Sequence, residues 1–290
     1  MQMPPETIVI HRGHGLPYSK GLMAQSLSAT GMSPERAFEL ARIVERRLAE
    51  GTTPEIGVNE LRELTEDVLL AEEGAGAVRR YQDWARLDRL ERPLVVLLAG
   101  TTGVGKSTLA TMLAARLGIT RVIATDVIRQ VLRAFFTHEA MPSVHYYAFD
   151  VGGVEGYLTQ AQRVGIGVSA IVERASTEGK PIMVEGVHVL PGALEPELRE
   201  RCVVAEALLV VEDPEAHRGH FTARPGVRPA QRYLGQFEEI RELQEHLAER
   251  ARKEGVAVFA NHNVDETLTV LMGLVLDAVG QLRQAEPEVT

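Results

Sequence analysis

A glycine-rich segment near residue 100 is the part of the sequence best suited to chemistry. Residues 100–107 read GTTGVGKS, a full match to G-x-x-x-x-G-K-[ST], and they stand between an apolar, strand-like run and a helical pattern. Glycines there let backbone N–H groups turn inward around phosphate oxygens, aided by the positive end of the following helix. A glycine-rich turn that binds nothing is the weaker alternative, because both flanks fit a phosphate loop. The sequence predicts a nucleotide site made of Gly100, Thr101, Thr102, Gly103, Val104, Gly105, Lys106, Ser107 and Thr108.

Two side chains of this phosphate loop (residues 100–107) and one acid further along have expected roles at the phosphates. Lys106 is expected to reach the β- and γ-phosphates and to act in catalysis, and Ser107 to bind Mg²⁺. Glu185 ends the apolar run PIMVE and is expected beside the phosphate loop, as a further ligand of Mg²⁺ that also faces the acceptor. The alternative for Glu185 is a buried acid paired with an arginine, because a charge at the end of a strand must be compensated.

A second carboxylate is a candidate for the acceptor side. Asp126 follows the short apolar run RVIAT, which places it at the carboxyl edge of a parallel sheet, where open α/β folds bind ligands. There it is expected to accept a proton from an acceptor hydroxyl. Its alternative is the N-cap of the helix VIRQVLRAFF, a position that aspartate favours. His145 and His188 are weaker candidates for acceptor contacts, because a lone loop histidine is more often an ordinary polar contact.

Residues 216–236, the arginine segment, carry local positive charge in an acidic chain. The stretch AHRGHFTARPGVRPAQRYLGQ contains no acidic residue, and its prolines and glycines are typical of a hinged flap. Arginines there suit a lid that closes over phosphates and carboxylates. The alternative is a solvated loop paired with the acid-rich helix EEIRELQEHLAER. We expect Arg218 and Arg224 to act in catalysis and Arg228 and Arg232 to contact the acceptor.

The surrounding elements predict an α/β fold with two domains. Five nearly uniformly apolar runs start at Leu94, Arg121, Pro181, Glu206 and Val256, as expected of parallel strands covered on both faces. Helical patterns near 106–117, 126–136, 154–178, 230–254 and 264–283 separate or follow them. Before them, residues 7–10 are expected to form a strand, and GMSPERAFELARIVERRLAEG and VNELRELTEDVLLAEE to form helices. We therefore expect a small, mostly helical domain over 1–90 and a kinase-like domain over 91–290.

Composition narrows the class of protein. The formal net charge of −9 disfavours nucleic acid and acidic membranes as partners, and Cys202 is the only cysteine, which excludes an internal disulfide and a zinc ribbon. The most apolar stretch, TLTVLMGLVLDAVG, is too short to span a membrane and contains Asp277. These features indicate a cytoplasmic protein that acts on a small molecule.

Several stretches together resemble the 2-phosphoglycerate kinase family across nearly the whole chain. They are PYSKGLMAQSL, GTTGVGKSTLA, ATDVIRQVLR, EGVHVLPG, HRGHFTAR, RPAQRYLGQFEEIRELQ and VAVFANHNVDET. The resemblance implies a P-loop kinase domain, five parallel strands with flanking helices, and transfer of the γ-phosphoryl group of ATP to 2-phosphoglycerate. We also expect Arg129, within ATDVIRQVLR, to contact the acceptor. The segment SVHYYAF at Ser143 departs from the family pattern.

The N-terminal TIVIHRGHGLPYSKGLMAQSL resembles an ATP-cone, in which a strand, a basic turn and a later lysine hold a regulatory nucleotide. His11, Arg12 and Lys20 fall on those places. The usual Lys-Arg pair is His11-Arg12 here, so a structural role, in shaping the acceptor pocket or in forming a homodimer, stands beside the regulatory one.

Two alternatives to 2-phosphoglycerate phosphorylation stay open. The arginine segment specifies negative charge more clearly than a carbon skeleton, so the acceptor is either 2-phosphoglycerate or another phosphorylated or carboxylated small metabolite. A nucleotide-gated regulatory ATPase would combine the same two domains but would turn over ATP without regard to small acceptors.

Overall fold

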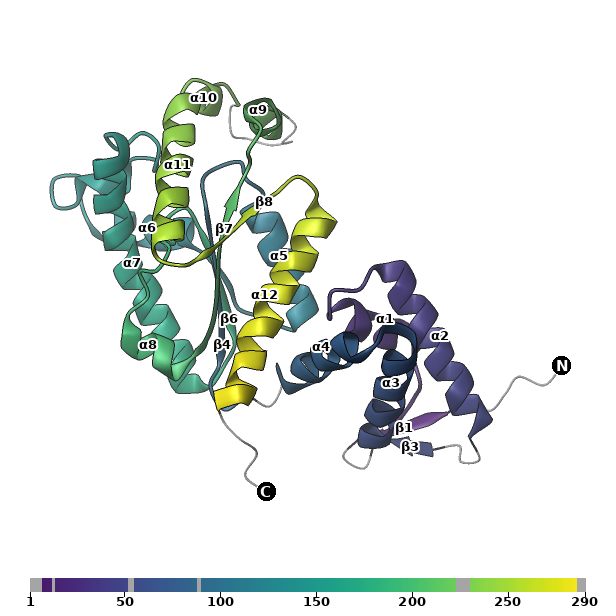
Figure 1. Cartoon of the computed structure of the whole chain (residues 1–290). Helices are drawn as coiled ribbons and strands as arrows, with labels where there is room; N and C mark the ends of the chain where they lie inside the picture. The colour runs from purple at the N-terminus through teal and green to yellow at the C-terminus, as the bar shows by residue number, and fades with distance from the viewer. Residues whose placement is uncertain (1–6, 12–13, 52–54, 88–89, 223–229, 286–290) are drawn as a thin grey trace. The chain divides into compact units, whose positions relative to one another are not determined.

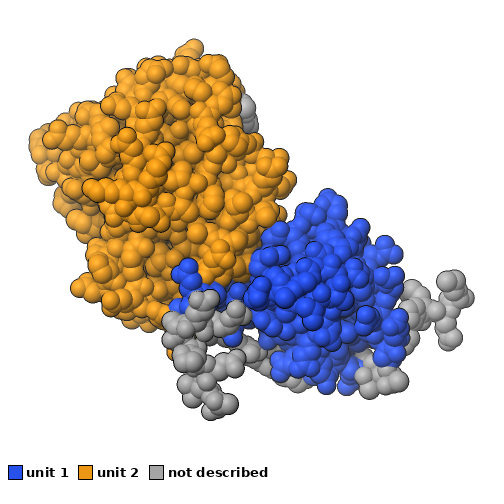
Figure 2. Space-filling model, in the orientation of Figure 1, with its two compact units in different colours: residues 1–89, 279–290 blue, residues 90–278 orange. Residues whose placement is uncertain are grey.

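The computed structural model of the chain describes residues 7–11, 14–51, 55–87, 90–222 and 230–285 (Figure 1). The chain divides into two compact units, residues 1–89 with 279–290 and residues 90–278, coloured separately in Figure 2. Within the described residues, no helix combines the length and the apolarity that crossing a membrane requires.

The first unit combines helices with a small sheet. Its elements are β1 (Ile8–His11), β2 (His14–Pro17), α1 (Lys20–Ser28), α2 (Pro34–Glu50), β3 (Glu55–Gly57), α3 (Val58–Glu73) and α4 (Ala75–Arg86). The strand order is β2-β1-β3, antiparallel on the β2 side and parallel on the β3 side. Helix α2 begins as its sequence predicts, because the Ser33 side chain accepts the Arg36 N–H at 3.2 Å and Pro34 is its first residue.

The nucleotide site expected in this unit stays a prediction. Lys20 forms an ion pair with Glu45, with 3.2 Å between its Nζ and the carboxylate, and both side chains are exposed. Arg12 and the side chain of His11 lie outside the described residues.

The second unit contains a five-stranded parallel sheet, as the sequence predicts. Its strands are β4 (Leu94–Gly100), β5 (Val122–Ala124), β6 (Ile182–Gly186), β7 (Val203–Val210) and β8 (Ala257–Ala260). They lie in the order β5-β6-β4-β7-β8, so the central strand β4 pairs with β6 on one side and β7 on the other. All seven residues of β4 are buried, because helices cover both faces of the sheet (Figure 1).

The helices of this unit form the two outer layers. They are α5 (Lys106–Leu117), α6 (Thr125–Phe135), α7 (Gly153–Glu178), α8 (Pro196–Arg201), α9 (Pro214–Thr222), α10 (Ala230–Leu234), α11 (Phe237–Lys253) and α12 (Val264–Ala285), with a 3-10 turn at Pro142–His145. Helix α12 belongs to this unit up to Ala278 and to the first unit from Val279. Helices α7 and α11 cover one face of the sheet, and α5 and α12 lie on the other (Figure 1). In the first layer, Val164 and Leu247 pack against Leu97 of β4 in one buried cluster.

Two expected elements differ from the structure. The helix predicted over 230–254 is interrupted at Gly235 and Gln236, giving α10 and α11. Glycine weakens a helix, and Gln236 is the N-cap residue from which α11 starts again. The strand predicted from Glu206 begins at Val203, because Val203 pairs in register with Leu94 of β4.

The carboxyl edge of the sheet brings the predicted site residues together. Strand β4 leads into the phosphate loop, β5 runs directly into α6, and β6 ends with Glu185 and Gly186. Because these three strands are parallel neighbours, their carboxyl ends meet at one edge of the sheet, where this class of fold binds ligands.

Candidate active site

A cavity opens at this edge. The phosphate loop and α5, the β5–α6 junction, the end of β6 and three aromatic rings surround it. Its lining residues include Thr102, Gly103, Lys106, Ser107, Ala124, Thr125, Asp126, Tyr147, Phe149, Glu185, Gly186, Val187 and Tyr233. Four predicted residues from three segments therefore share one cavity: Lys106, Ser107, Asp126 and Glu185.

Side chains hold the carbonyl groups of the phosphate loop in a fixed direction. Lys106 Nζ donates to the Thr101 carbonyl at 2.6 Å, and Asn261, at the end of β8, donates to the Val104 carbonyl at 3.0 Å. His217 and His220 of α9 bind the Thr102 and Gly103 carbonyls at 2.9 and 2.8 Å. In a trans peptide the next N–H points opposite to the carbonyl, so these bonds leave the loop's N–H groups free to face the cavity.

Two glycines of the loop have no room for a side chain. Gly103 has φ 91°, and a Cβ there would stand 2.6 Å from Phe221 Cζ. Gly105 has φ 88°, and a Cβ there would stand 2.5 Å from Asn261 Nδ2. Positive φ and close neighbours both require glycine at these positions.

Ser107 and Glu185 form an oxygen pair at the start of α5. Ser107 Oγ donates to Glu185 Oε1 at 2.8 Å, and the Glu185 side chain is buried. The alternative, Glu185 as an arginine's partner, is not seen among the described residues, where Glu185 accepts its hydrogen bond from Ser107. Register explains the contact, since Glu185 pairs with Leu98 two residues before the loop starts.

The N-cap interpretation of Asp126 is wrong. Strand β5 runs into α6 without a loop, so Ala124 is the N-cap residue and Asp126 lies within the first turn. Its carboxylate is half-exposed and accepts a hydrogen bond from Arg129 Nε at 3.3 Å. The carboxylate therefore faces the cavity with an ionic partner on one side.

Arg129 lies beneath the cavity rather than in its wall. Its side chain is 5% exposed, and its guanidinium donates to the carbonyls of Val144 and Tyr146 at 3.0 and 3.1 Å. These bonds fix the loop between α6 and α7, residues 136–152, against α6. Direct contact of Arg129 with an acceptor stays a prediction.

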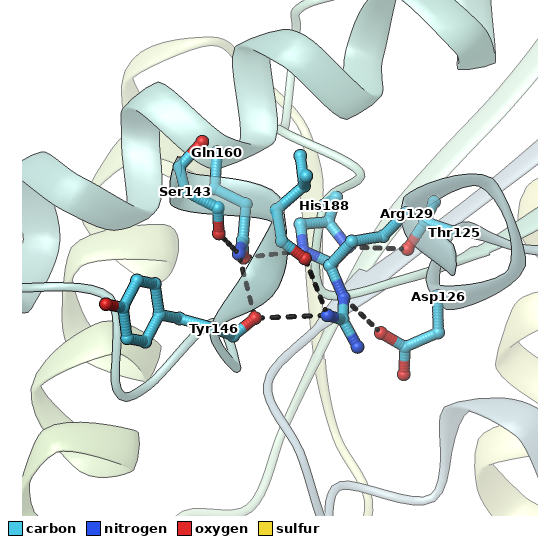
Figure 3. Close-up of polar contacts among 8 residues, drawn as sticks. Thr125, Asp126, Arg129, Ser143, Tyr146, Gln160 and His188 are labelled. Carbon is cyan, nitrogen blue, oxygen red and sulfur yellow. Dashed lines mark hydrogen bonds and ion pairs between the residues drawn. The ribbon is translucent and has the colours of Figure 1, made fainter. Parts of the chain in front are cut away.

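A buried chain of hydrogen bonds continues from the cavity into α7 (Figure 3). His188 Nδ1 and Thr125 Oγ1 are 3.1 Å apart, and His188 Nε2 and Gln160 Oε1 are 2.9 Å apart. The Gln160 amide donates to the carbonyls of Ser143 and Tyr146, so its oxygen must face His188. His188 then carries its proton on Nε2 and accepts the Thr125 hydroxyl proton on Nδ1. Both ring nitrogens are engaged, which makes His188 a support for Thr125 rather than a lining residue.

Both described arginines of the arginine segment pair with acids: Arg218 with the acid-rich helix, as the alternative interpretation holds, and Arg232 with an acid outside that helix. Arg218 lies 3.9 Å from the Phe237 ring centroid and donates to Glu238 at 3.1 Å. Arg232 lies 4.3 Å from the Tyr147 centroid and donates to Asp150 at 3.1 Å. Neither lines the cavity. Arg224 and Arg228 lie outside the described residues.

The aromatic wall of the cavity was missed from the sequence. The Tyr147 and Phe149 rings stack at 5.5 Å between centroids, Phe149 meets Tyr233 edge-on at 5.5 Å, and Tyr233 stacks on Phe221 at 5.3 Å. Only two of these rings lie in SVHYYAF, so the sequence carried no sign that they form one surface. His145, from the same loop, is half-buried and bonded to the Phe136 carbonyl at 3.0 Å, away from the cavity lining.

Two buried histidines predict how stability depends on pH. Burial lowers the pKa of His188 and of His217 to about 4, from an ordinary value of 6.5. Between these pH values the unfolded chain binds protons that the folded chain does not, so the free energy of unfolding should fall as the pH falls from about 7 toward 4. Near pH 5 each ring should take up about one proton on unfolding. Urea denaturation across this range measures the slope, and His188→Gln should reduce it by about one proton; an unchanged slope would contradict the assignment for His188.

The parallel sheet, the phosphate loop and the serine–glutamate pair define a P-loop kinase. The family described as zeta toxin matches residues 79–151. A 2-phosphoglycerate kinase of Methanopyrus kandleri is 34% identical over 91% of this chain and 85% of its own length, and one of Pyrococcus horikoshii is 36% identical over 91% and 92%. A shikimate kinase from Acinetobacter baumannii, in complex with shikimate, aligns with 71% of this chain and 99% of its own, at a TM-score of 0.40 and 14% identity. The chain belongs to the 2-phosphoglycerate kinase family.

Proposed function

We propose that the protein transfers the γ-phosphoryl group of ATP to the C3 hydroxyl of 2-phosphoglycerate, giving 2,3-bisphosphoglycerate and ADP. The observation that carries this proposal is the meeting of Lys106, Ser107–Glu185 and Asp126 in one cavity, in a chain of this family. The phosphate loop supplies anion binding and Asp126 supplies a proton acceptor across the same space.

The phosphate loop would bind the β- and γ-phosphates. Its N–H groups and the amino end of α5 provide partial positive charge, and Lys106 adds a full charge that follows the transferring group. These donors are held before the substrate arrives, so they need little rearrangement as negative charge shifts toward the leaving oxygen.

The residues present fit a magnesium ion. Mg²⁺ prefers oxygen ligands and is usually held by one or two protein oxygens together with phosphates and water. Ser107 Oγ and Glu185 Oε1, 2.8 Å apart and next to the phosphate loop, offer such a pair. Bound there, the ion would neutralise phosphate charge; Ser107 and Glu185 would hold it directly or through water.

Asp126 would act on the acceptor hydroxyl. As the C3 oxygen bonds to the γ-phosphorus and the bond from phosphorus to the bridging oxygen of ADP breaks, the hydroxyl proton passes to the Asp126 carboxylate. The Arg129 guanidinium keeps that carboxylate oriented. The proton is later released to water.

The acceptor's carboxylate and phosphate need positively charged partners. The arginine segment is the best source of such partners. Arg218 and Arg232 form ion pairs that are roughly half-exposed. Exposed pairs are worth only about 0–1 kcal/mol each, so exchanging Glu238 or Asp150 for a substrate anion costs little. Arg224 and Arg228, in the same segment, remain proposed acceptor contacts. His145 and His188 do not line the cavity, so they are not part of this proposal. A cytoplasmic location and a homodimer are further proposals.

An acceptor panel tests the substrate. With ATP and Mg²⁺, ³¹P NMR should show a bisphosphate from 2-phosphoglycerate. Glycerate should be poorer by about a hundredfold or more, because it lacks the phosphate and so loses at least one charged hydrogen bond to the arginines of the arginine segment. The 3-phosphoglycerate isomer should also react poorly, because its hydroxyl and phosphate exchange places. If another phosphorylated acid reacts and 2-phosphoglycerate does not, the kinase class stands and the acceptor changes; ATP turnover indifferent to all acceptors would favour the regulatory ATPase.

A further inference from the structure

Helix α9 contacts the phosphate loop through two histidines that sequence reasoning left without a role. They are separated from the loop by 115 and 117 residues, yet they bind two successive carbonyls, those of Thr102 and Gly103. A carbonyl oxygen only accepts, so each ring nitrogen must carry the proton. The two rings use different atoms: His217 donates from Nε2 and His220 from Nδ1.

The position of His217 is enforced by packing. Its side chain is fully buried, and its ring stacks on Phe221 with 5.4 Å between centroids. Phe221 and His217 also fill the space beside Gly103 where any Cβ would stand. Helix α9 therefore lies so close to the phosphate loop that no side chain fits between them at Gly103.

The burial of His217 is costly, which points to a role beyond filling space. In the described part of the chain, its Nδ1 has no hydrogen-bond partner although it is buried. Leaving a buried acceptor unpaired costs free energy, and a phenylalanine would stack equally well without that cost. What only the histidine supplies is the Nε2–H bond to Thr102. Its lowered pKa keeps the ring neutral, so the bond, not a charge, is its contribution.

We propose that His217 and His220 are positioning residues of the nucleotide site: by holding the Thr102 and Gly103 carbonyls away from the cavity, they aim the N–H groups of Gly103 and Val104 at the phosphates. Because most of α9 belongs to the arginine segment, the same two bonds also connect that segment to the nucleotide site. This inference rests on the proposed nucleotide binding but not on the identity of the acceptor.

A crossed set of amide substitutions tests the two bonds separately. The amide nitrogen of glutamine reaches the place of a histidine Nε2, and that of asparagine reaches the place of Nδ1. We expect His217→Gln and His220→Asn to bind ADP within about threefold of the wild-type Kd, measured by calorimetry. His217→Asn and His220→Gln should each weaken ADP binding about tenfold, the loss of about one hydrogen bond, with the KM of the acceptor unchanged.

Controls separate positioning from packing. Thermal denaturation of all four variants reports on packing, and His246→Gln in α11 is the matched substitution away from the loop. Equal ADP affinities in all four variants would overturn the inference. So would losses of ADP affinity that correlate with the melting temperature and not with the length of the amide side chain. ADP binding with the crossed pattern, but without phosphorylation of 2-phosphoglycerate, would support the inference while removing the proposed acceptor.

Discussion

Replacing Lys106 by alanine should lower kcat by about a thousandfold or more while leaving the protein folded. Lys106 lines the cavity and is the first residue of α5, so its ammonium is the phosphate loop's own full positive charge. Removing a donor that acts on developing charge costs about 10²–10³ in rate, and a residue that neutralises the transferring group costs more. Alanine is the best helix former, so α5 should still begin at this position.

Steady-state kinetics measures the loss of kcat, and thermal denaturation shows whether the variant stays folded. The stability cost should include the hydrogen bond to the Thr101 carbonyl, about 1 kcal/mol. Lys180→Ala is the matched control, because Lys180 is exposed and precedes β6 at the opposite edge of the sheet. Near-normal turnover in Lys106→Ala would falsify the phosphate-loop assignment.

Replacing Asp126 by asparagine should lower kcat by about 10²–10⁴, the range for loss of a positioned general base. Asparagine keeps an oxygen that accepts the Arg129 N–H, but it cannot take up a proton at this pH. The carboxylate is 53% exposed, so the lost ion pair should change the free energy of unfolding by no more than about 1 kcal/mol.

The control for this substitution is another ion-paired acid. Glu178→Gln removes a carboxylate paired with Arg121 at 2.5 Å, near the amino-terminal edge of the sheet, and should leave turnover unchanged. Rapid-quench measurement of the phosphoryl-transfer step shows whether chemistry itself has slowed. If Asp126→Asn keeps the wild-type rate and loses stability, Asp126 serves only as the partner of Arg129.

The sequence by itself determined the parallel sheet, the phosphate loop and the position of Glu185. The pattern GTTGVGKS lies within one turn and its chemistry is local, so its residues predict its shape. The parallel sheet followed from apolar runs separated by helical patterns, and Glu185 followed from its place at a strand end. Local patterns suffice where the groups involved are sequence neighbours or where strand register brings them together.

Asp126 shows where a local pattern misled. Aspartate before a helical pattern indicates an N-cap, but this cap requires a turn between strand and helix. Pairing of β5 with β6 through Ala124 extends the strand to the residue before α6, and no such turn remains. Tertiary pairing therefore moved Asp126 from the cap into the first turn, where its carboxylate meets Arg129.

Only the tertiary structure decided what supports the site. Asn261 binds the phosphate loop from 157 residues away, and His217 and His220 from more than a hundred, so no spacing in the sequence could indicate these bonds. The same holds for the link from Thr125 through His188 to Gln160, which depends on α7 packing against the end of β6. Every residue has the same backbone carbonyl group, so the sequence does not mark which carbonyls a side chain binds. That choice depends on how helices pack on the sheet.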